Sequence, residues 1–366
     1  MKKRLIMILT VMIAVLALSA GTMAADEDSS AVTLTLKQAV EKGLKDNRQI
    51  YLAGLAVESA EINVKQTKGS AEQYKDSGMS RNTEMAYEAI TLYPQSAQLN
   101  LDLAKLQLNY TVNSVKCGIE KAYNGLQLAE KNLEVLRLSQ NNAKTLYDNT
   151  VSKQKLGVAS KMDVMNAESA YLNAQATYQN GRTSVLSARM ALNSLLNQAV
   201  ETRIIIKDKQ SFKAAEGLSL QKSLEEALKT DLAYNQAKTA EAIGALTFTK
   251  VKDFNAENTY AYKQGVIAYE QQKQALRSAA DSLESAVRLA YENLAVAEAN
   301  YRTYAASRDL AKEAYRLTRL RYDNGMATIY DVQNAEAAYL QAETGLMNAI
   351  NNYNQAKNAI SYGVYQ

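Results

Sequence analysis

The sequence predicts an all-α protein built from elongated, antiparallel helical hairpins in two tandem repeats. Three observations lead to this fold class. The 366 residues include one proline and are rich in alanine, leucine, glutamine, asparagine, lysine and glutamate, a composition typical of long coiled helices. Apolar residues return every seven positions over long stretches, which indicates coiled-coil packing. One helix-turn motif also occurs twice, at 156–168 and at 324–336.

The first residues have the pattern of a secretory signal peptide. Lys2, Lys3 and Arg4 form a positive segment, an apolar segment follows from 5 to 20, and small residues near position 24 offer a cleavage site. We therefore expect residues 1–24 to be a signal peptide and the mature protein to be exported to the cell envelope. A retained anchor is the alternative, although the apolar run is short for a membrane-spanning helix.

The first repeat, 34–200, is expected to contain a short helix, a second helix, a helical segment before Pro94, and two long helices joined at a tip. A proline disfavours helical geometry at the residue before it, so a helix break is expected near Tyr93. Gly69, Ser70 and Gly78 are expected to loosen the second helix. The predicted helices before the tip span 34–47, 49–68, 83–93 and 98–155.

The second repeat, 218–366, shows the same order of patterns. The apolar pattern of the short helix at Leu36 returns 184 residues later at Leu220, whereas the motif of the hairpin tip returns 168 residues later. The first repeat therefore carries 16 extra residues between its first and third helices. A weak point is expected at 253–255. The linker 201–217 contains three isoleucines, 204–206, which could form a short strand or simply packed linker.

Each long helix carries two apolar rows with a seven-residue spacing. The rows start at Val115 and Ile119, at Val164 and Ala167, at Leu283 and Val287, and at Val332 and Ala335. In the helix after each tip, one row holds mostly large residues and the other mostly small ones, so that neighbouring helices can approach closely. A single hairpin cannot bury such rows alone. Two hairpins, or several chains, must therefore close around them.

The duplicated motif has the features of a hairpin tip. A glycine, Gly157 or Gly325, supplies the left-handed conformation that ends one helix. A serine or threonine three positions later caps the next helix, and an aspartate three residues further suits the positive helix start. The predicted cap pairs are Ser160 with Asp163 and Thr328 with Asp331.

Composition argues against an enzyme. The chain has no histidine, and Cys117 is its only cysteine, which excludes histidine-based triads and a thiolate zinc cluster. Neither a phosphate loop nor a dinucleotide fingerprint is present. The obvious acidic residues are expected on solvated helix faces, and capping explains Asp163 and Asp331 better than paired catalysis does. The net charge of +4 is made of interleaved signs. We expect no cofactor, no metal and no nucleic-acid partner.

Two copies of Gly-x-Ala-[Ser/Thr]-x-x-Asp-Val-x-Asn-Ala-Glu, in one register with the heptads, resemble the TolC-like outer-membrane efflux protein family. The likeness covers about 34–365 and is best at 156–175 and 321–343. Three shorter pieces look like the family's third, seventh and last helices. They are Ala122–Leu126, Ala290–Leu294 and Tyr353–Lys357.

The resemblance implies a homotrimer whose six hairpins close into a twelve-helix tunnel. In the family, hairpin tips dock on a periplasmic adaptor, or membrane fusion protein, which links them to an inner-membrane pump. Solutes or proteins leave through the tunnel. The plain alternative is that the tip residues only shape the turn. Carried over by position, the partner-binding residues are Gly157, Val158, Ala159, Gly325, Met326 and Ala327.

The chain departs from the family in one respect. Members normally insert two strands between the second and third helices of each repeat, and three chains build a membrane barrel. The gaps after 93 and after 254 are too short for strands of about ten residues. We expect a TolC-like α-barrel subunit without a β-barrel, and membrane insertion is in doubt. The chain is then a conduit component in efflux or secretion, or a structural coiled-coil envelope protein with no transport role.

Overall fold

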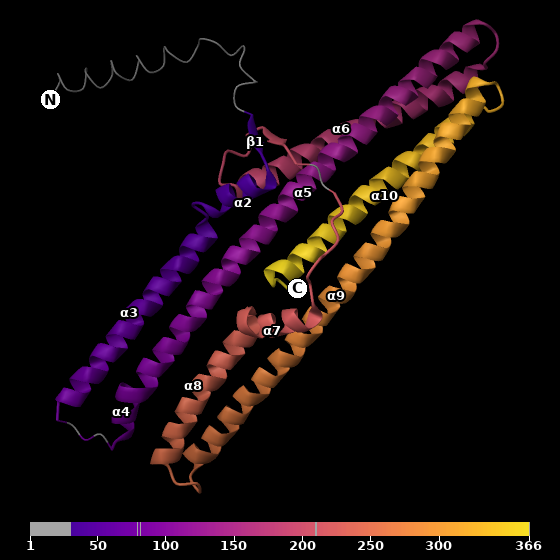
Figure 1. Cartoon of the computed structure of the whole chain (residues 1–366). Helices are drawn as coiled ribbons and strands as arrows, with labels where there is room; N and C mark the ends of the chain where they lie inside the picture. The colour runs from indigo at the N-terminus through magenta and orange to yellow at the C-terminus, as the bar shows by residue number, and fades with distance from the viewer. Residues whose placement is uncertain (1–30, 79, 81, 209–210, 366) are drawn as a thin grey trace, which may run out of the picture.

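The computed structural model describes residues 31–365 except 79, 81, 209 and 210 (Figure 1). The predicted signal peptide, 1–24, lies outside the described residues. The all-α prediction is confirmed, since the described residues are mostly helical. The helices are α2 (Leu36–Leu44), α3 (Arg48–Asp76), α4 (Glu84–Tyr87), the π-helix η1 (Glu88–Leu92), α5 (Tyr93–Lys155), α6 (Lys161–Leu195), α7 (Leu220–Thr230), α8 (Leu232–Phe254), α9 (Tyr260–Asp323) and α10 (Ile329–Tyr362).

Two long hairpins form the molecule. Helices α5 and α6 make the first, and α9 and α10 make the second; α5 and α9 run the whole length of the molecule (Figure 1). Near the tips the lateral order is α6, α5, α10, α9. In the opposite half it is α3, α5, α8, α9. The molecule therefore has two different lateral edges, one made of α6 and α3 and the other made of α9.

The predicted seven-residue rows lie in the hairpin seams. Ile119 and Leu126 of α5 and Val185 and Leu192 of α6 are buried in one hydrophobic cluster. In the second hairpin, Leu294 packs in another cluster with residues of α10. This burial confirms the predicted rows and explains why the hairpins stay closed along their length.

The duplication is visible in the side chains of the seams. Tyr147 stacks on Tyr171 in the first hairpin, with ring centroids 6.3 Å apart and an interplanar angle of 10°. Tyr315 stacks on Tyr339 in the second, at 6.1 Å and 5°. Each pair lies across its hairpin at the same position in the repeat. The two hairpins therefore share packing geometry as well as sequence pattern.

A small parallel sheet packs on the hydrophobic cluster that α2, α5 and α6 share, near mid-length of the molecule (Figure 1). Strand β1 (Val32–Leu34) pairs with β2 (Ile204–Ile206), with Val32 opposite Ile204. The three isoleucines of the linker thus form a strand, which was one of the two expectations. Strand β1 was not predicted, because three residues are too few for alternation to be recognised.

The expected helix break near Tyr93 is wrong. The chain passes from α4 through the π-helix η1 into α5 without leaving helical geometry, and Tyr93 N–H bonds the carbonyl of Glu88, five residues back. Pro94 falls in the first turn of α5. The proline is tolerated there because the wider π-helix turn directly before it makes room for its ring and for its missing N–H.

Helix α3 is longer than predicted. It runs through Gly69 and Ser70 to Asp76, because its packed face continues with Val64 and Ala71, both buried. Its length of 29 residues, against 23 for α8, accounts for part of the extra length of the first repeat.

Candidate functional site: the hairpin tips

Both tips lie at the same end of the molecule and share one backbone geometry (Figure 1). Gly157 and Gly325 have φ values of 75° and 72°. Val158 N–H bonds the Lys153 carbonyl at 2.9 Å, and Met326 N–H bonds the Arg321 carbonyl at 2.7 Å. A six-residue closure of this kind satisfies the last carbonyls of a helix and fixes the exit direction of the chain. The tips are therefore defined turns.

A reciprocal cap starts the helix after each tip. In the first, Ser160 Oγ accepts from Asp163 N–H at 3.1 Å, and Asp163 Oδ2 accepts from Ser160 N–H at 2.8 Å. In the second, Thr328 and Asp331 make the same pair at 3.2 and 2.7 Å. Hydrogen bonds from the cap hydroxyl and then the cap backbone lower the pKa of both aspartates. These carboxylates act on the backbone and are unsuited to proton transfer.

The structure places the predicted partner-binding residues at the apex of the turns. Gly157 and Gly325 are exposed, and Ala159 and Ala327 are half-buried. Val158 is 74% exposed and Met326 is 64% exposed. Sequence reasoning missed further exposed apolar residues beside them, although an apolar residue in a polar turn is a visible signal. These are Leu156, Met162 and Tyr330.

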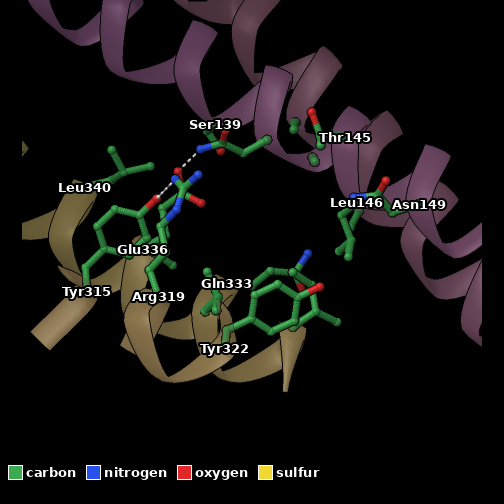
Figure 2. A pocket seen from close by; sticks show the side chains of 17 residues that line it. Ser139, Thr145, Leu146, Asn149, Tyr315, Arg319, Tyr322, Gln333, Glu336 and Leu340 are labelled. Carbon is green, nitrogen blue, oxygen red and sulfur yellow. Dashed lines mark hydrogen bonds between the residues drawn. The ribbon is translucent and has the colours of Figure 1, made fainter. Parts of the chain in front are cut away.

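A cavity of about 340 Å³ lies between the two hairpins just below the tips (Figure 2). Its walls come from all four long helices. Asn142 of α5 donates a hydrogen bond to Glu336 of α10, and Arg319 of α9 donates to Tyr315 Oη at 3.3 Å. Burial raises the pKa of Glu336, and the nearby Arg319 partly opposes that shift. Near the tips the Asn142–Glu336 hydrogen bond thus joins the two hairpins across this cavity.

The contact between α5 and α10 is polar over much of its length. Glu120 of α5 accepts from Asn358 and from Tyr362 Oη of α10. The expectation that the acidic residues sit on solvated faces is wrong for Glu120 and Glu336, each 9% exposed. Further buried polar side chains on these helices are Asn124, Gln127 and Asn351. The two hairpins are thus joined by hydrogen bonds, whereas each hairpin is closed by apolar rows.

Apolar side chains line both lateral edges at heptad spacing. On α6 the exposed row consists of Met165, Leu172 and Leu186. On α9 it consists of Leu289, Val296, Leu310 and Leu317. Exposed apolar rows at this spacing on a long helix suit a contact with a further helix.

Among the described residues, no group of acidic and cysteine side chains could hold a metal ion. Nor does any helix of the described chain have the length and apolar character needed to cross a membrane.

The model of the outer membrane efflux protein family matches residues 253–362, which include α9 and α10. Among curated proteins, none matches the chain in sequence. Together with the fold, the family match confirms the resemblance to the TolC-like efflux proteins.

Solved outer membrane proteins share the fold over nearly the whole chain. The Campylobacter jejuni CmeC outer membrane channel is 13% identical, with a TM-score of 0.72, 95% of this chain covered and 91% of that one. VceC of Vibrio cholerae is 12% identical, with a TM-score of 0.71 and coverage of 90% and 96%. The outer-membrane channel OprN is 14% identical, with a TM-score of 0.73 and coverage of 90% and 89%.

Proposed function

We propose that this chain is an exported subunit of a helical conduit in an efflux or secretion assembly of the cell envelope. The observation that carries the proposal is the pair of exposed apolar rows on opposite edges, one on α6 and one on α9. The match to the outer membrane efflux protein family and the fold shared with the outer membrane channels CmeC and OprN support it.

The edges favour assembly with further copies of the chain. The surface of α6 and α3 differs from that of α9, so a contact between them on two copies is head-to-tail. A head-to-tail contact closes into a ring when its rotation divides a full turn, and it forms an open filament when the rotation does not. Burying one leucine of such a row stabilises the contact by about 1.5–3 kcal/mol. The resemblance to the family makes the proposed ring a trimer, with the repeats 34–200 and 218–366 alternating around it and 201–217 linking them.

The tips are proposed to dock on an adaptor protein. Gly157, Val158 and Ala159 in one turn, and Gly325, Met326 and Ala327 in the other, are the proposed contact residues. Exposed apolar side chains on rigid, capped turns suit a binding surface, because little conformational entropy is lost when a partner covers them. Both tips lie at one end, so a ring would present all of them to the same partner (Figure 1).

Transport is tested in cells that lack the chain. Dye or drug retention should rise in the deletion strain and return to normal when the wild-type chain is restored. A chain with Val158→Asp and Met326→Asp should fold but fail to restore export, because charged tips cannot dock as apolar ones do. Unchanged retention in the deletion strain, with no adaptor recovered by cross-linking from the tips, would instead support a structural coiled-coil envelope protein.

A further inference from the structure

The two sides of the four long helices differ in charge. The helices of a hairpin are antiparallel, so residues that directly precede a seam residue lie on one side of both helices, and residues that directly follow one lie on the other. From mid-length to the stacked tyrosine pairs, Lys121 is the only charged residue that precedes a seam residue. On the other side, α5 alone has Glu130, Glu134, Arg137 and Lys144. The ranges compared are 115–147, 171–195, 283–315 and 339–360.

A second layer, made of α2, the small sheet, the linker and α7, covers one side of the long helices near mid-length (Figure 1). Four residues that directly follow a seam residue, one from each long helix, hydrogen-bond to this layer. They are Tyr123, Asn193, Tyr291 and Lys357, whose partners lie in β1 at 3.0 Å, in the segment after α6 at 2.8 Å, in α7 at 2.8 Å and in the linker at 3.4 Å. All four long helices therefore turn their charged side towards the layer.

The opposite side is open and consists mainly of amide, hydroxyl and small side chains. On α6 every residue that precedes a seam residue in 171–195 is exposed, and Asn173, Asn180 and Ser187 are among them. Exposed residues at such positions on α10 include Gln341 and Asn348. On α9, one of the two rows on this side is the exposed apolar row of the lateral edge. These positions on the four helices form what we call the uncharged face.

Helix stability does not explain the composition of the uncharged face. Asparagine, serine and threonine are weaker helix formers than the lysine, arginine and glutamate that the chain uses on the opposite side. On that side, pairs such as Arg302 with Glu298, at 2.6 Å, also support the helix. An exposed surface without charge is less soluble than a charged one. The lack of charge therefore needs an explanation beyond folding.

The uncharged stretch is long. Along the continuation of the same rows, charges return close to the tips at Lys153, Asp163, Arg321 and Asp331, of which the two aspartates are the helix caps. Lys121 lies at the other end of the stretch. At 1.5 Å per residue, about 39 Å of α5 separate Lys121 from the stacked Tyr147. The absence of charge thus extends over several helical turns on every long helix.

We infer that the uncharged face lines the conduit, and that this wall passes small solutes of either charge without selecting between them. This inference rests on the proposed ring. The second layer fits on the longer outer circumference of a ring, whereas inside it would fill the tunnel. A wall of one sign would concentrate solutes of the opposite sign and repel the others. Amide and hydroxyl groups bind donors and acceptors only weakly in water, so a passing solute is released again.

The position of the face is tested by cysteine labelling of the mature chain. Cys117, the only cysteine, is replaced by serine, and one new cysteine is introduced. Asn348→Cys probes the uncharged face, and Lys144→Cys, also exposed but on the opposite side, is the matched control. In the assembled protein a maleimide with a long polyethylene glycol chain should modify Lys144→Cys at least tenfold faster than Asn348→Cys. In urea the two rates should be equal.

The charge of the wall is tested with two small thiol reagents, a cationic and an anionic methanethiosulfonate. At low salt, their rate ratio at Asn348→Cys should lie within about threefold of the ratio for a free thiol in solution. Adding Asn352→Asp, one turn away on the same face, should favour the cationic reagent at least tenfold and shows that the assay detects a charge. Asn141→Asp, on the charged side of α5, should leave the ratio unchanged.

The outcomes separate this inference from the proposed function. If the protein assembles and the bulky reagent modifies Asn348→Cys as fast as Lys144→Cys, the ring stands but the uncharged face lies outside it, and the inference is refuted. A tenfold preference for a reagent of one sign at Asn348→Cys would also refute it, because the wall would then select by charge. If the protein does not assemble, the proposed ring and this inference both fall.

Discussion

Single leucines in the seams contribute to stability through complete burial. Leu126 of α5 is 0% exposed, and it contacts the core that α2, α5, α6 and β2 share. Leu126→Ala should lower the free energy of unfolding by about 2–5 kcal/mol, because it removes buried methyl groups and leaves a cavity. Chemical denaturation measures the change.

A matched leucine tests whether burial is the cause. Leu310 of α9 is 74% exposed, so Leu310→Ala should change the unfolding free energy of a single dilute chain by no more than about 0.5 kcal/mol. Equal losses at Leu126 and Leu310 would show that the seam rows have been misassigned.

The carboxyl group of Glu336 makes the free energy of unfolding depend on pH in a defined direction. Burial raises the pKa of its carboxyl group above the ordinary value. A carboxyl group whose pKa rises on folding stabilises the folded state at low pH, and this contribution is lost as the pH climbs from the unfolded pKa through the folded one. Glu336→Gln keeps an acceptor for Asn142 and has no charge to bury. It should therefore be more stable than the wild type near pH 7 and no more stable near pH 4.

The control for this prediction lies at the same place in the other repeat. Glu168 corresponds to Glu336 in the duplicated motif but is exposed. Glu168→Gln should leave the difference in stability between pH 4 and pH 7 as it is in the wild type. Urea unfolding at both pH values provides the comparison. A Glu336→Gln protein that is less stable near pH 7 would mean that the folded state favours the charged carboxylate.

The cap of the first tip could be predicted from the sequence, whereas the burial of two glutamates could not. The spacing of Ser160 and Asp163 within the turn motif was enough to predict a cap, because capping depends on residues three positions apart. Glu120 and Glu336 were expected in solvent, because heptad analysis assigns one buried face to each helix. Helices α5 and α10 bury a second face against each other, and sequence periodicity does not reveal that contact.

At the scale of the element, the caps determine where the helices after the tips begin. Ser160→Ala should cost about 1 kcal/mol, because the backbone N–H of Asp163 loses its acceptor. Hydrogen exchange should become faster at the amides of the first turn of α6. Thr177→Ala is the control, since the Thr177 hydroxyl bonds only the Asn173 carbonyl within the same helix, at 2.8 Å. Protection of the first turn equal to that of the wild type would exclude a role for the cap.

The long helices were predictable because their apolar rows repeat over many turns. The junction at Tyr93 was not, because the rule for the residue before proline is statistical and a π-helix turn absorbs the conflict locally. Strand β1 could be found only through its partner: Val32 pairs with Ile204, 172 residues away in the sequence. Contacts of this kind depend on the tertiary fold.

At the scale of the whole molecule, we propose that the exposed apolar rows on α6 and α9 determine how the chain assembles. Leu310→Glu places a charge in the exposed row of α9 and should prevent ring closure while the hairpins stay folded. The expected result is a drop in solution mass to that of one chain, with an unchanged circular dichroism spectrum. Leu228→Glu, which alters an exposed leucine of α7, should keep the mass of the wild type. A wild-type mass for Leu310→Glu would remove α9 from the interface.

The number of hairpins followed from the duplication, but their arrangement did not. Seven-residue rows show that each helix has a partner without saying which helix it is. The lateral order of α6, α5, α10 and α9 places polar side chains between the hairpins and apolar rows at the outer edges. Only with this order known can the two edges be recognised as surfaces for further copies.

The most direct test of the proposed ring is the mass of the mature wild-type protein in solution without detergent, measured by light scattering. The exposed rows on α6 and α9 predict a closed oligomer, and the family resemblance predicts three chains. A mass of one chain at micromolar concentration would contradict the ring, because both edges would then be stable in water. Aggregates that only detergent disperses would contradict it as well, since the exposed rows would then prefer an apolar phase to one another.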